Sequence, residues 1–196
     1  LLLENRRSAD RPEVADAKMG LPGAKVTWQT RRKNMTDVCS SCHDQMWIGN
    51  FYTQYDAFID LYNTKFAIPG KDLYGLAKPL LNPVQFANEL DFTWYELWHH
   101  EGRRARHGTS MMAPDFSHWH GTYEVAKRFY MEMVPQLQHL IDQNAASPDA
   151  EKAKAAAALK AKLDEVLNSD DHKWFLGKVD PEEATERKKA LEDFRK

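Results

Sequence analysis

Cysteine is scarce in this chain, since Cys39 and Cys42 are its only two among 196 residues. Two cysteines exclude a scaffold held together by several disulfides. Positive charge is not in excess either, because 27 basic and 29 acidic side chains give a formal net charge of −2. The chain therefore lacks the surplus of Lys and Arg with which a general nucleic-acid binder contacts phosphates. No apolar run approaches the roughly 18 residues of a membrane span, so we expect no membrane-spanning helix.

Alternation of apolar and polar residues, the signature of β-strands, is nearly absent. Apolar residues instead recur at helical spacing over long stretches. The sequence therefore predicts an all-α fold class in which long C-terminal helices form a helical bundle. The expected elements are a helix over 44–66 ended by Pro69-Gly70, a short helix from Asp72 to Pro79, a long helix over 83–107 closed by Gly108, and a third long helix over 117–144.

Several local signals refine this arrangement. Ser117 is expected to cap the third long helix, and Pro135 is expected to kink it. The Ala/Lys-rich stretch 149–167 favours helix strongly, but its apolar face is thin, so we expect it to lie outside the core. A last, charged and exposed helix is expected over 181–195, beginning at Pro181. Residues 1–34 are polar, and we expect them to form an irregular segment that wraps a larger body.

Both cysteines belong to the run Cys39-Ser40-Ser41-Cys42-His43, a Cys-x-x-Cys-His pattern. This spacing lets two thiols add to the two vinyl groups of one haem edge, while the adjacent histidine reaches the iron. We therefore expect one covalent haem c, tethered by Cys39 and Cys42, with His43 as the proximal ligand. Covalent haem implies the periplasm or an equivalent exported compartment.

The cysteine pair has two other possible interpretations, a redox dithiol and half of a zinc site. A redox dithiol usually lies in a βαβ context, and the sequence shows none. Half of a zinc site would need a second Cys or His pair at ligand spacing, which His99-His100 does not supply convincingly. With the haem c interpretation, the chain divides into the irregular segment 1–34, a haem-motif and long-helix region over 35–145, and a C-terminal helical extension over 146–196.

Histidines are more numerous than one haem requires. Five of the seven that remain lie between residues 99 and 120, whereas one haem takes a single further axial ligand, His or Met. Most of them are either ordinary core and interface residues or ligands to haems attached elsewhere. As distal candidates we rank His107, His120 and His100. Beside them, Arg103, Arg104 and Arg106 suit haem propionates, or else form a solvated helix face.

Three runs in this region resemble the C-terminal part of the octahaem hydroxylamine oxidoreductase family, including its hydrazine dehydrogenase-like relatives. The runs are Trp98-His99-His100-Glu101-Gly102-Arg103-Arg104-Ala105-Arg106-His107-Gly108, Met111-Met112-Ala113-Pro114-Asp115 and Trp119-His120-Gly121-Thr122-Tyr123-Glu124. The upstream Cys-x-x-Cys-His is similar to the last haem motif of that family. The resemblance covers residues 35–145 well, and the two ends are less specific.

The resemblance implies a periplasmic, largely helical, trimeric enzyme that passes electrons through an array of bis-His haems. It also implies a five-coordinate, modified catalytic haem c that is cross-linked to a tyrosine of the neighbouring subunit. Tyr123 is the best match for that tyrosine, and Tyr130 is the second choice. The simpler interpretation of Tyr123 is an ordinary aromatic residue in the apolar stripe of its helix.

One departure from the family is large, because the family has eight haem motifs and this chain has one. We therefore expect a fragment or a split subunit of a multihaem enzyme. Its partners would be the remainder of that enzyme in a homotrimer or higher oligomer, a small nitrogenous substrate and an electron-acceptor cytochrome. The enzyme would oxidise hydroxylamine or hydrazine, or, without the tyrosine cross-link, reduce nitrite or hydroxylamine. The alternatives are a stand-alone monohaem c electron-transfer cytochrome and a metal-binding or redox-dithiol module.

Overall fold

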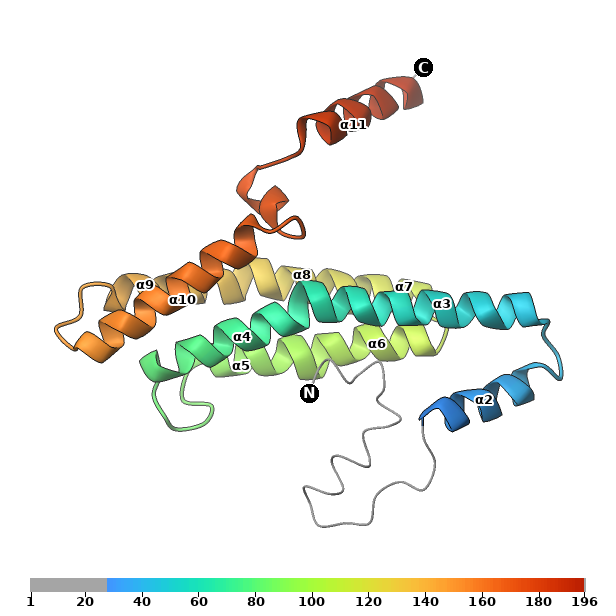
Figure 1. Cartoon of the computed structure of the whole chain (residues 1–196), viewed down its shortest axis with the longest axis horizontal. Coiled ribbons are helices and arrows are strands. Elements are labelled where there is room, and N and C mark those ends of the chain that lie inside the picture. Colours follow the sequence, from blue (N-terminus) through green and yellow to red (C-terminus); the bar gives the residue numbers. More distant parts are fainter. Residues whose placement is uncertain (1–27, 196) are drawn as a thin grey trace, which may run out of the picture.

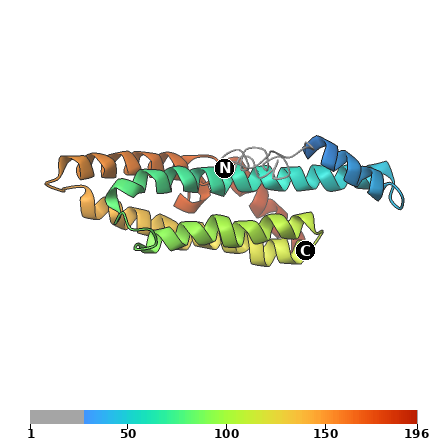
Figure 2. The same cartoon turned by 90° about the horizontal axis from the view of Figure 1, so that it is seen from below.

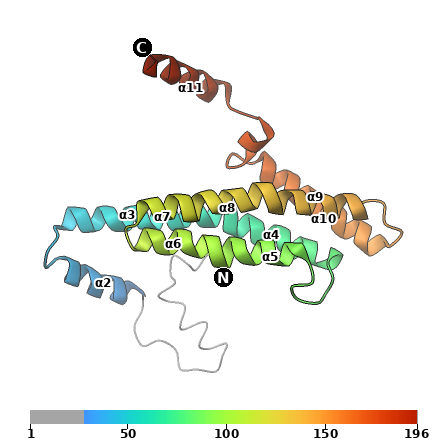
Figure 3. The same cartoon turned by 180° about the vertical axis from the view of Figure 1, so that it is seen from behind.

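The structure is a computed structural model that describes residues 28–195, and it contains helices and no strand within that range (Figure 1). The all-α prediction is thereby confirmed. Four long helical rods dominate these residues, and each runs antiparallel to the one before it (Figures 1 and 3). Seen from below, α3–α4 and α10 form one layer, and α5–α6 with α7–α9 form the other (Figure 2).

The first three rods are each continuous helices that pass through π-helical turns. The first consists of α3 (Gln45–Tyr62), a π turn (Asn63–Ala67) and α4 (Ile68–Ala77), and a 3₁₀ turn (Lys78–Leu80) follows it. The second consists of α5 (Glu89–Tyr95), a π turn (Glu96–Glu101) and α6 (Gly102–Ser110). The third consists of α7 (Pro114–Ser117), a π turn (His118–Thr122), α8 (Tyr123–Arg128), a π turn (Phe129–Met133) and α9 (Val134–Asn144).

The remaining elements lie at the two ends of the described residues. α2 (Trp28–Cys39) precedes the first rod, and α10 (Ala150–Asn168) is the fourth rod. A 3₁₀ turn (Lys173–Leu176) and α11 (Pro181–Phe194) follow α10. α11 extends away from the bundle and is exposed along its whole length, as the sequence predicts (Figures 1 and 3).

The core lies between the rods and is made of apolar side chains from every rod. Tyr62, Leu97, Phe129, Leu137 and Leu163 are all at most 2% exposed. Aromatic rings pack edge to face at the centre of the core, where the ring centroids of Phe66 and Phe129 lie 5.6 Å apart. Burial of these stripes, which repeat at helical spacing, gives the bundle its main stabilisation.

Proline and glycine do not stop the helices where the sequence predicts. The first rod continues through Pro69 to Ala77, so the predicted stop at Pro69-Gly70 is wrong. Pro69 lies in the first turn of α4, directly after a π turn, where the missing N–H of proline is tolerated. Gly108 is likewise buried inside α6, which continues to Ser110.

Two predicted helix starts are also displaced. The second rod begins at Glu89 rather than near 83, because Asn88 and Asp91 form a capping box. The third begins at Pro114, so Ser117 is not its cap. The Ser117 hydroxyl is buried and lies 3.1 Å from the Thr109 hydroxyl, which ties the third rod to α6. Pro135 lies in the first turn of α9, directly after the π turn that ends at Met133.

Two further predictions are corrected by burial and helicity. Residues 28–34 belong to α2, so the irregular interpretation of 1–34 fails there, and residues 1–27 lie outside the described residues. α10 is part of the core and not outside it, because Leu159 and Leu163 are fully buried. Its stripe is thin but continuous, and it packs on α4 and α9.

Candidate functional site

The Cys-x-x-Cys-His run forms a tight turn between α2 and α3. Cys39 is the last residue of α2, and its carbonyl accepts the N–H groups of Cys42 and His43 at 3.1 and 3.0 Å. Asp44 then caps α3 by accepting the Trp47 N–H at 2.8 Å. Neither cysteine forms a disulfide; Cys39 is half-buried and Cys42 is exposed. The sequence thus places two thiols and an imidazole on one short, anchored turn.

α2 is held against α3 by a charged pair. The Arg32 guanidinium donates from both terminal nitrogens to the two oxygens of Asp56, each at 2.8 Å. It also lies over the Tyr52 ring at 4.5 Å. A bidentate pair of this kind fixes direction as well as distance. This contact therefore positions the C-terminal end of α2, and with it Cys39, beside the first rod.

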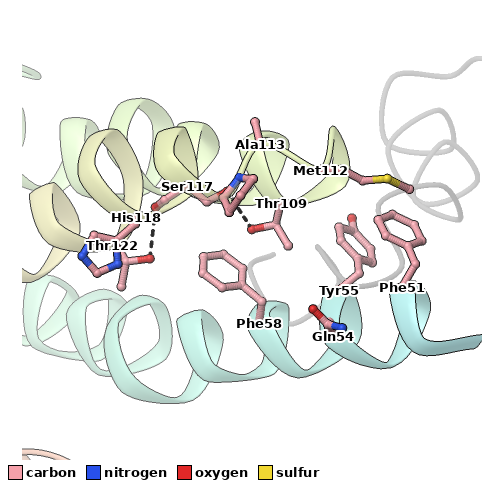
Figure 4. Close-up of a pocket in the computed structure, with 11 residues that line it drawn as sticks. Phe51, Gln54, Tyr55, Phe58, Thr109, Met112, Ala113, Ser117, His118 and Thr122 are labelled. Carbon is pink, nitrogen blue, oxygen red and sulfur yellow. Dashed lines mark hydrogen bonds between the residues drawn. The ribbon is translucent and has the colours of Figure 1, made fainter. Parts of the chain in front are cut away.

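Two adjoining cavities lie beside this turn, and together we name them the groove. The first, of about 300 Å³, is lined by Cys39 together with Met35, Trp47, Ile48, Phe51, Tyr52, Tyr55, Ser110 and Met112. The second, of about 500 Å³, lies between α3 and the α6–α7 connection (Figure 4). Phe51, Tyr55 and Met112 line both cavities, so the two adjoin along α3.

The residues present fit a covalently bound haem. Two free thiols stand three residues apart, an exposed imidazole follows directly, and Cys39 lines a cavity of ligand-binding size. The His43 ring stacks on Trp47 at 3.9 Å between ring centroids, which keeps the imidazole next to the turn. Cavity walls of Phe, Tyr, Trp and Met match the apolar faces of a porphyrin.

The three ranked distal histidines are exposed, and two of them face a carboxylate. His100 Nδ1 lies 3.8 Å from the buried Glu101, and His120 Nδ1 lies 3.6 Å from Glu124. His107 lies on α6, where partial burial and the charges of Arg103 and Arg106 lower its pKa. None of the three lines the groove beside Cys39.

Two of the π turns carry the crowded histidines. His99 and His100 lie on the turn Glu96–Glu101, and His118 and His120 lie on the turn His118–Thr122. A π turn inserts one residue into the helix, so it changes which side chains share a face. Such turns are frequent at functional sites, and here they carry four of the five histidines that lie between residues 99 and 120.

The three arginines near these histidines have different roles. Arg103 is exposed. Arg104 pairs with Glu124 at 3.1 Å, which links α6 to α8. Arg106 is engaged inside the bundle, because its guanidinium donates to the carbonyls of Gly102 and Trp98 and lies over the Tyr62 ring at 5.2 Å. Of the three arginines expected from the sequence to suit haem propionates, Arg106 is thus bound within the bundle and Arg103 is the exposed one.

The two candidate tyrosines differ sharply in exposure. Tyr123 is 54% exposed and lies 6.0 Å from the exposed Trp119 ring. Tyr130 is 6% exposed, its hydroxyl lies 2.7 Å from His172 Nδ1, and burial raises its pKa to about 12. The geometry makes Tyr123 the accessible side chain and Tyr130 a core residue.

Three residues at these sites were not ranked from the sequence. His118 lines the second cavity of the groove, and Met112 lines both cavities with a left-handed backbone (φ 55°). His172 is almost fully buried against Phe129 and Tyr130. No local pattern signals Met112, because methionine rarely adopts positive φ and only the fold places it there.

Neither a metal cluster nor a bilayer-crossing helix is found in residues 28–195. Across this range no three His, Cys, Asp or Glu side chains are grouped so that they could hold a metal ion. No helix in the same range combines the length and the apolar character needed to cross a membrane. Comparisons with family models, with curated proteins and with solved structures find no match for this chain.

Proposed function

We propose that this chain is the C-terminal, last-haem part of a hydroxylamine oxidoreductase-like multihaem c enzyme. Cys39 and Cys42 hold one haem c, and His43 is its proximal ligand. The bound haem supplies reversible one-electron transfer at its iron. The whole enzyme removes electrons from hydroxylamine or hydrazine, and a reductive member acting on nitrite or hydroxylamine is the variant of the same proposal.

The observation that carries this proposal is the surplus of histidines on two π turns, of which all but the half-buried His99 are exposed. His99, His100, His118 and His120 lie there, and His107 follows on α6. One tethered haem uses a single further axial ligand. Histidines beyond that number, held at an aromatic surface, fit ligands to haems carried by the rest of a larger enzyme.

The neighbours of these histidines suit iron binding. A carboxylate beside one ring nitrogen orients an imidazole and leaves the other nitrogen for the metal. Glu101 and Glu124 lie 3.8 and 3.6 Å from Nδ1 of His100 and His120, which is close enough for a small rotation of the side chains to form such a hydrogen bond. For His107, the lowered pKa favours the neutral imidazole, which is the form that binds iron.

Assembly and location follow from the same proposal. The exposed Tyr123 would reach the catalytic haem of a neighbouring subunit in a homotrimer or higher oligomer. Electrons would leave through the haem chain to an acceptor cytochrome in the periplasm or an equivalent exported compartment. These partners are proposals that rest on the family resemblance of residues 35–145.

The test is to express the chain with a cytochrome c maturation system and to measure intact mass and the pyridine haemochrome spectrum. We expect one covalent haem per chain, and none in the double variant Cys39→Ser, Cys42→Ser. A chain without covalent haem would favour the dithiol or metal-binding module. One haem on an isolated, stable monomer with full electron-transfer activity would favour the stand-alone cytochrome.

A further inference from the structure

The groove starts at the residue that tethers the proposed haem. Cys39 lines the first cavity, and a thioether bond to Cys39 would hold one haem edge within a bond length of its sulfur. The first cavity shares Phe51, Tyr55 and Met112 with the second, so the two adjoin. A haem attached at Cys39 therefore has both cavities beside it, between α3 and the α6–α7 connection, while Cys42 and His43 stand outside their linings.

The chemistry of the groove changes along its length. Around Cys39 the walls are mainly apolar, with Met35, Trp47 and Ile48. The second cavity adds Gln54 beside Tyr55, then Phe58, and towards His118 the hydroxyl-bearing side chains of Thr109, Ser117 and Thr122 (Figure 4). A haem c has an apolar thioether edge and carries its propionates on the opposite edge. Apart from Gln54, the polar side chains of the groove likewise lie at the His118 end, where the hydroxyls of Thr109, Ser117 and Thr122 bond to one another or to backbone carbonyls.

Met112 is held in the groove by an unusual backbone. Its φ of 55° lies in the left-handed region, which costs a non-glycine residue about 1–2 kcal/mol. The Met112 N–H donates to the Thr109 carbonyl and the next N–H donates to Gly108, so the turn is fixed. The long apolar side chain is nevertheless half exposed. A strained, half-exposed thioether at a cavity wall is explained by contact with an apolar group in that cavity.

We propose that the haem tethered at Cys39 and Cys42 lies in this groove and contacts Met112. The inference rests on the proposed haem attachment and adds the surface of the bundle that covers the haem. The competing site is the outer face of the turn, where His43 stacks on Trp47. A second copy of the chain seated in the groove is the other alternative.

The first readout is the midpoint potential of the haem in two matched variants. Met112→Asn brings a polar group to both cavities and keeps the fold, because asparagine tolerates left-handed φ. Met111→Asn is the control, since Met111 is 77% exposed and lines neither cavity. A polar neighbour favours the ferric state, so we expect Met112→Asn to shift the potential downwards and Met111→Asn to leave it unchanged.

The deciding readout is NMR of the full haem-loaded chain with ¹³C-labelled methionine methyl groups. A low-spin ferric haem is paramagnetic and a low-spin ferrous haem is not, so methyl groups beside the haem change shift on reduction. We expect the signals of Met112 and Met35 to move, and the signal of the exposed Met131 to stay. The signal lost in Met112→Asn assigns Met112.

Each other outcome overturns the proposal in a distinguishable way. If covalent haem is present but the Met112 and Met35 signals do not move on reduction, the haem lies outside the groove, and the proposed haem attachment still stands. If the Met112 signal responds to dilution and not to haem oxidation state, a second copy fills the groove. If no haem is attached, the proposed function fails and the groove assignment fails with it.

Discussion

His172 joins the segment after α10 to the bundle. Its ring is 1% exposed, stacks on Phe129 at 5.2 Å, and accepts or donates a hydrogen bond at 2.7 Å to the Tyr130 hydroxyl. Burial lowers the pKa of His172 below its ordinary value of 6.5, and the nearby Asp171 only partly opposes this. The folded chain therefore holds His172 as a neutral imidazole at neutral pH.

This burial predicts a pH-dependent stability. Because the folded-state pKa is below the unfolded one, the unfolded chain binds more protons once the pH falls below about 6.5. The contribution of His172 is thus complete above that pH and is lost as the pH falls towards the folded-state pKa. We expect the free energy of unfolding, measured by urea titration with circular dichroism, to decrease from about pH 7.5 to about pH 5.

The control for this effect is His172→Gln, which removes the titrating group and should flatten part of the decrease. His107 also has a lowered pKa and keeps its own share of the slope in that variant. Tyr130→Phe should instead lower stability by about 1–3 kcal/mol at neutral pH, because it leaves a buried ring nitrogen without its partner. An unchanged slope in His172→Gln would contradict the assignment.

At the scale of helices, the second and third rods touch backbone to backbone at Gly121. A Cβ atom added to Gly121 would lie 2.5 Å from the Ala105 Cα on α6. Ala105 is itself 1% exposed, so neither residue has room to move away. This small-residue contact sets the separation of α6 from the π turn His118–Thr122, and it therefore positions His118 and His120.

The contact predicts opposite effects for two glycine substitutions. Gly121→Ala should destabilise the bundle by about 1–3 kcal/mol, because the new methyl group overlaps the backbone of α6. Gly75→Ala, on the exposed side of α4 with nothing within 4 Å, should stabilise the chain by about 0.5–1 kcal/mol through helix propensity. Chemical unfolding followed by circular dichroism gives both values. Equal effects of the two substitutions would show that the rods do not meet at Gly121.

The existence of the helices was predictable, and their boundaries were only partly so. The helices predicted over 149–167 and from Pro181 correspond to α10 and α11, whose N-caps are Asp149 and Asp180. The predicted helix ends at Pro69 and Gly108 are wrong. Pro69 lies in the first turn of α4, directly after a π turn, and Gly108 is buried by tertiary contacts inside α6. The capping box of Asn88 and Asp91 could have been recognised in the sequence, but the start of this helix was predicted from the apolar pattern alone.

The candidate site was also only partly predictable from the sequence. The Cys-x-x-Cys-His run is a local pattern, so its position was readable from the sequence. The groove is not local, since α2, α3 and the α6–α7 connection come together only after packing. The difference in exposure between Tyr123 and Tyr130 was not readable either, because the sequence pattern assigns both to one apolar stripe and only the packing of the rods buries one and exposes the other.

On the scale of the molecule, a set of large apolar side chains is exposed to solvent and does not take part in the packed core. Large aromatic and thioether groups of α5–α8 and their connections remain exposed, including Phe92, Tyr95, Met111, Phe116, Trp119 and Tyr123. Two of them lie against histidines, since Tyr95 stacks on His99 with 4.6 Å between ring centroids and the Phe116 ring lies 5.4 Å from that of His120. Exposed aromatic groups of this size are typical of interaction surfaces. We infer that they face the rest of the proposed enzyme.

The last prediction concerns Tyr123 in the assembled, haem-loaded enzyme. Tyr123→Phe removes the hydroxyl of a 54% exposed side chain, so the fold should be kept while the proposed link to a neighbouring catalytic haem is lost. We expect loss of the long-wavelength absorption of the modified haem and loss of the covalently joined species on a denaturing gel. Tyr130→Phe is the matched comparison, because its hydroxyl is committed to His172, and it should keep both signatures. An unchanged spectrum and unchanged gel migration in Tyr123→Phe would show that Tyr123 does not make the link, and loss of both in Tyr130→Phe alone would assign the link to the buried residue.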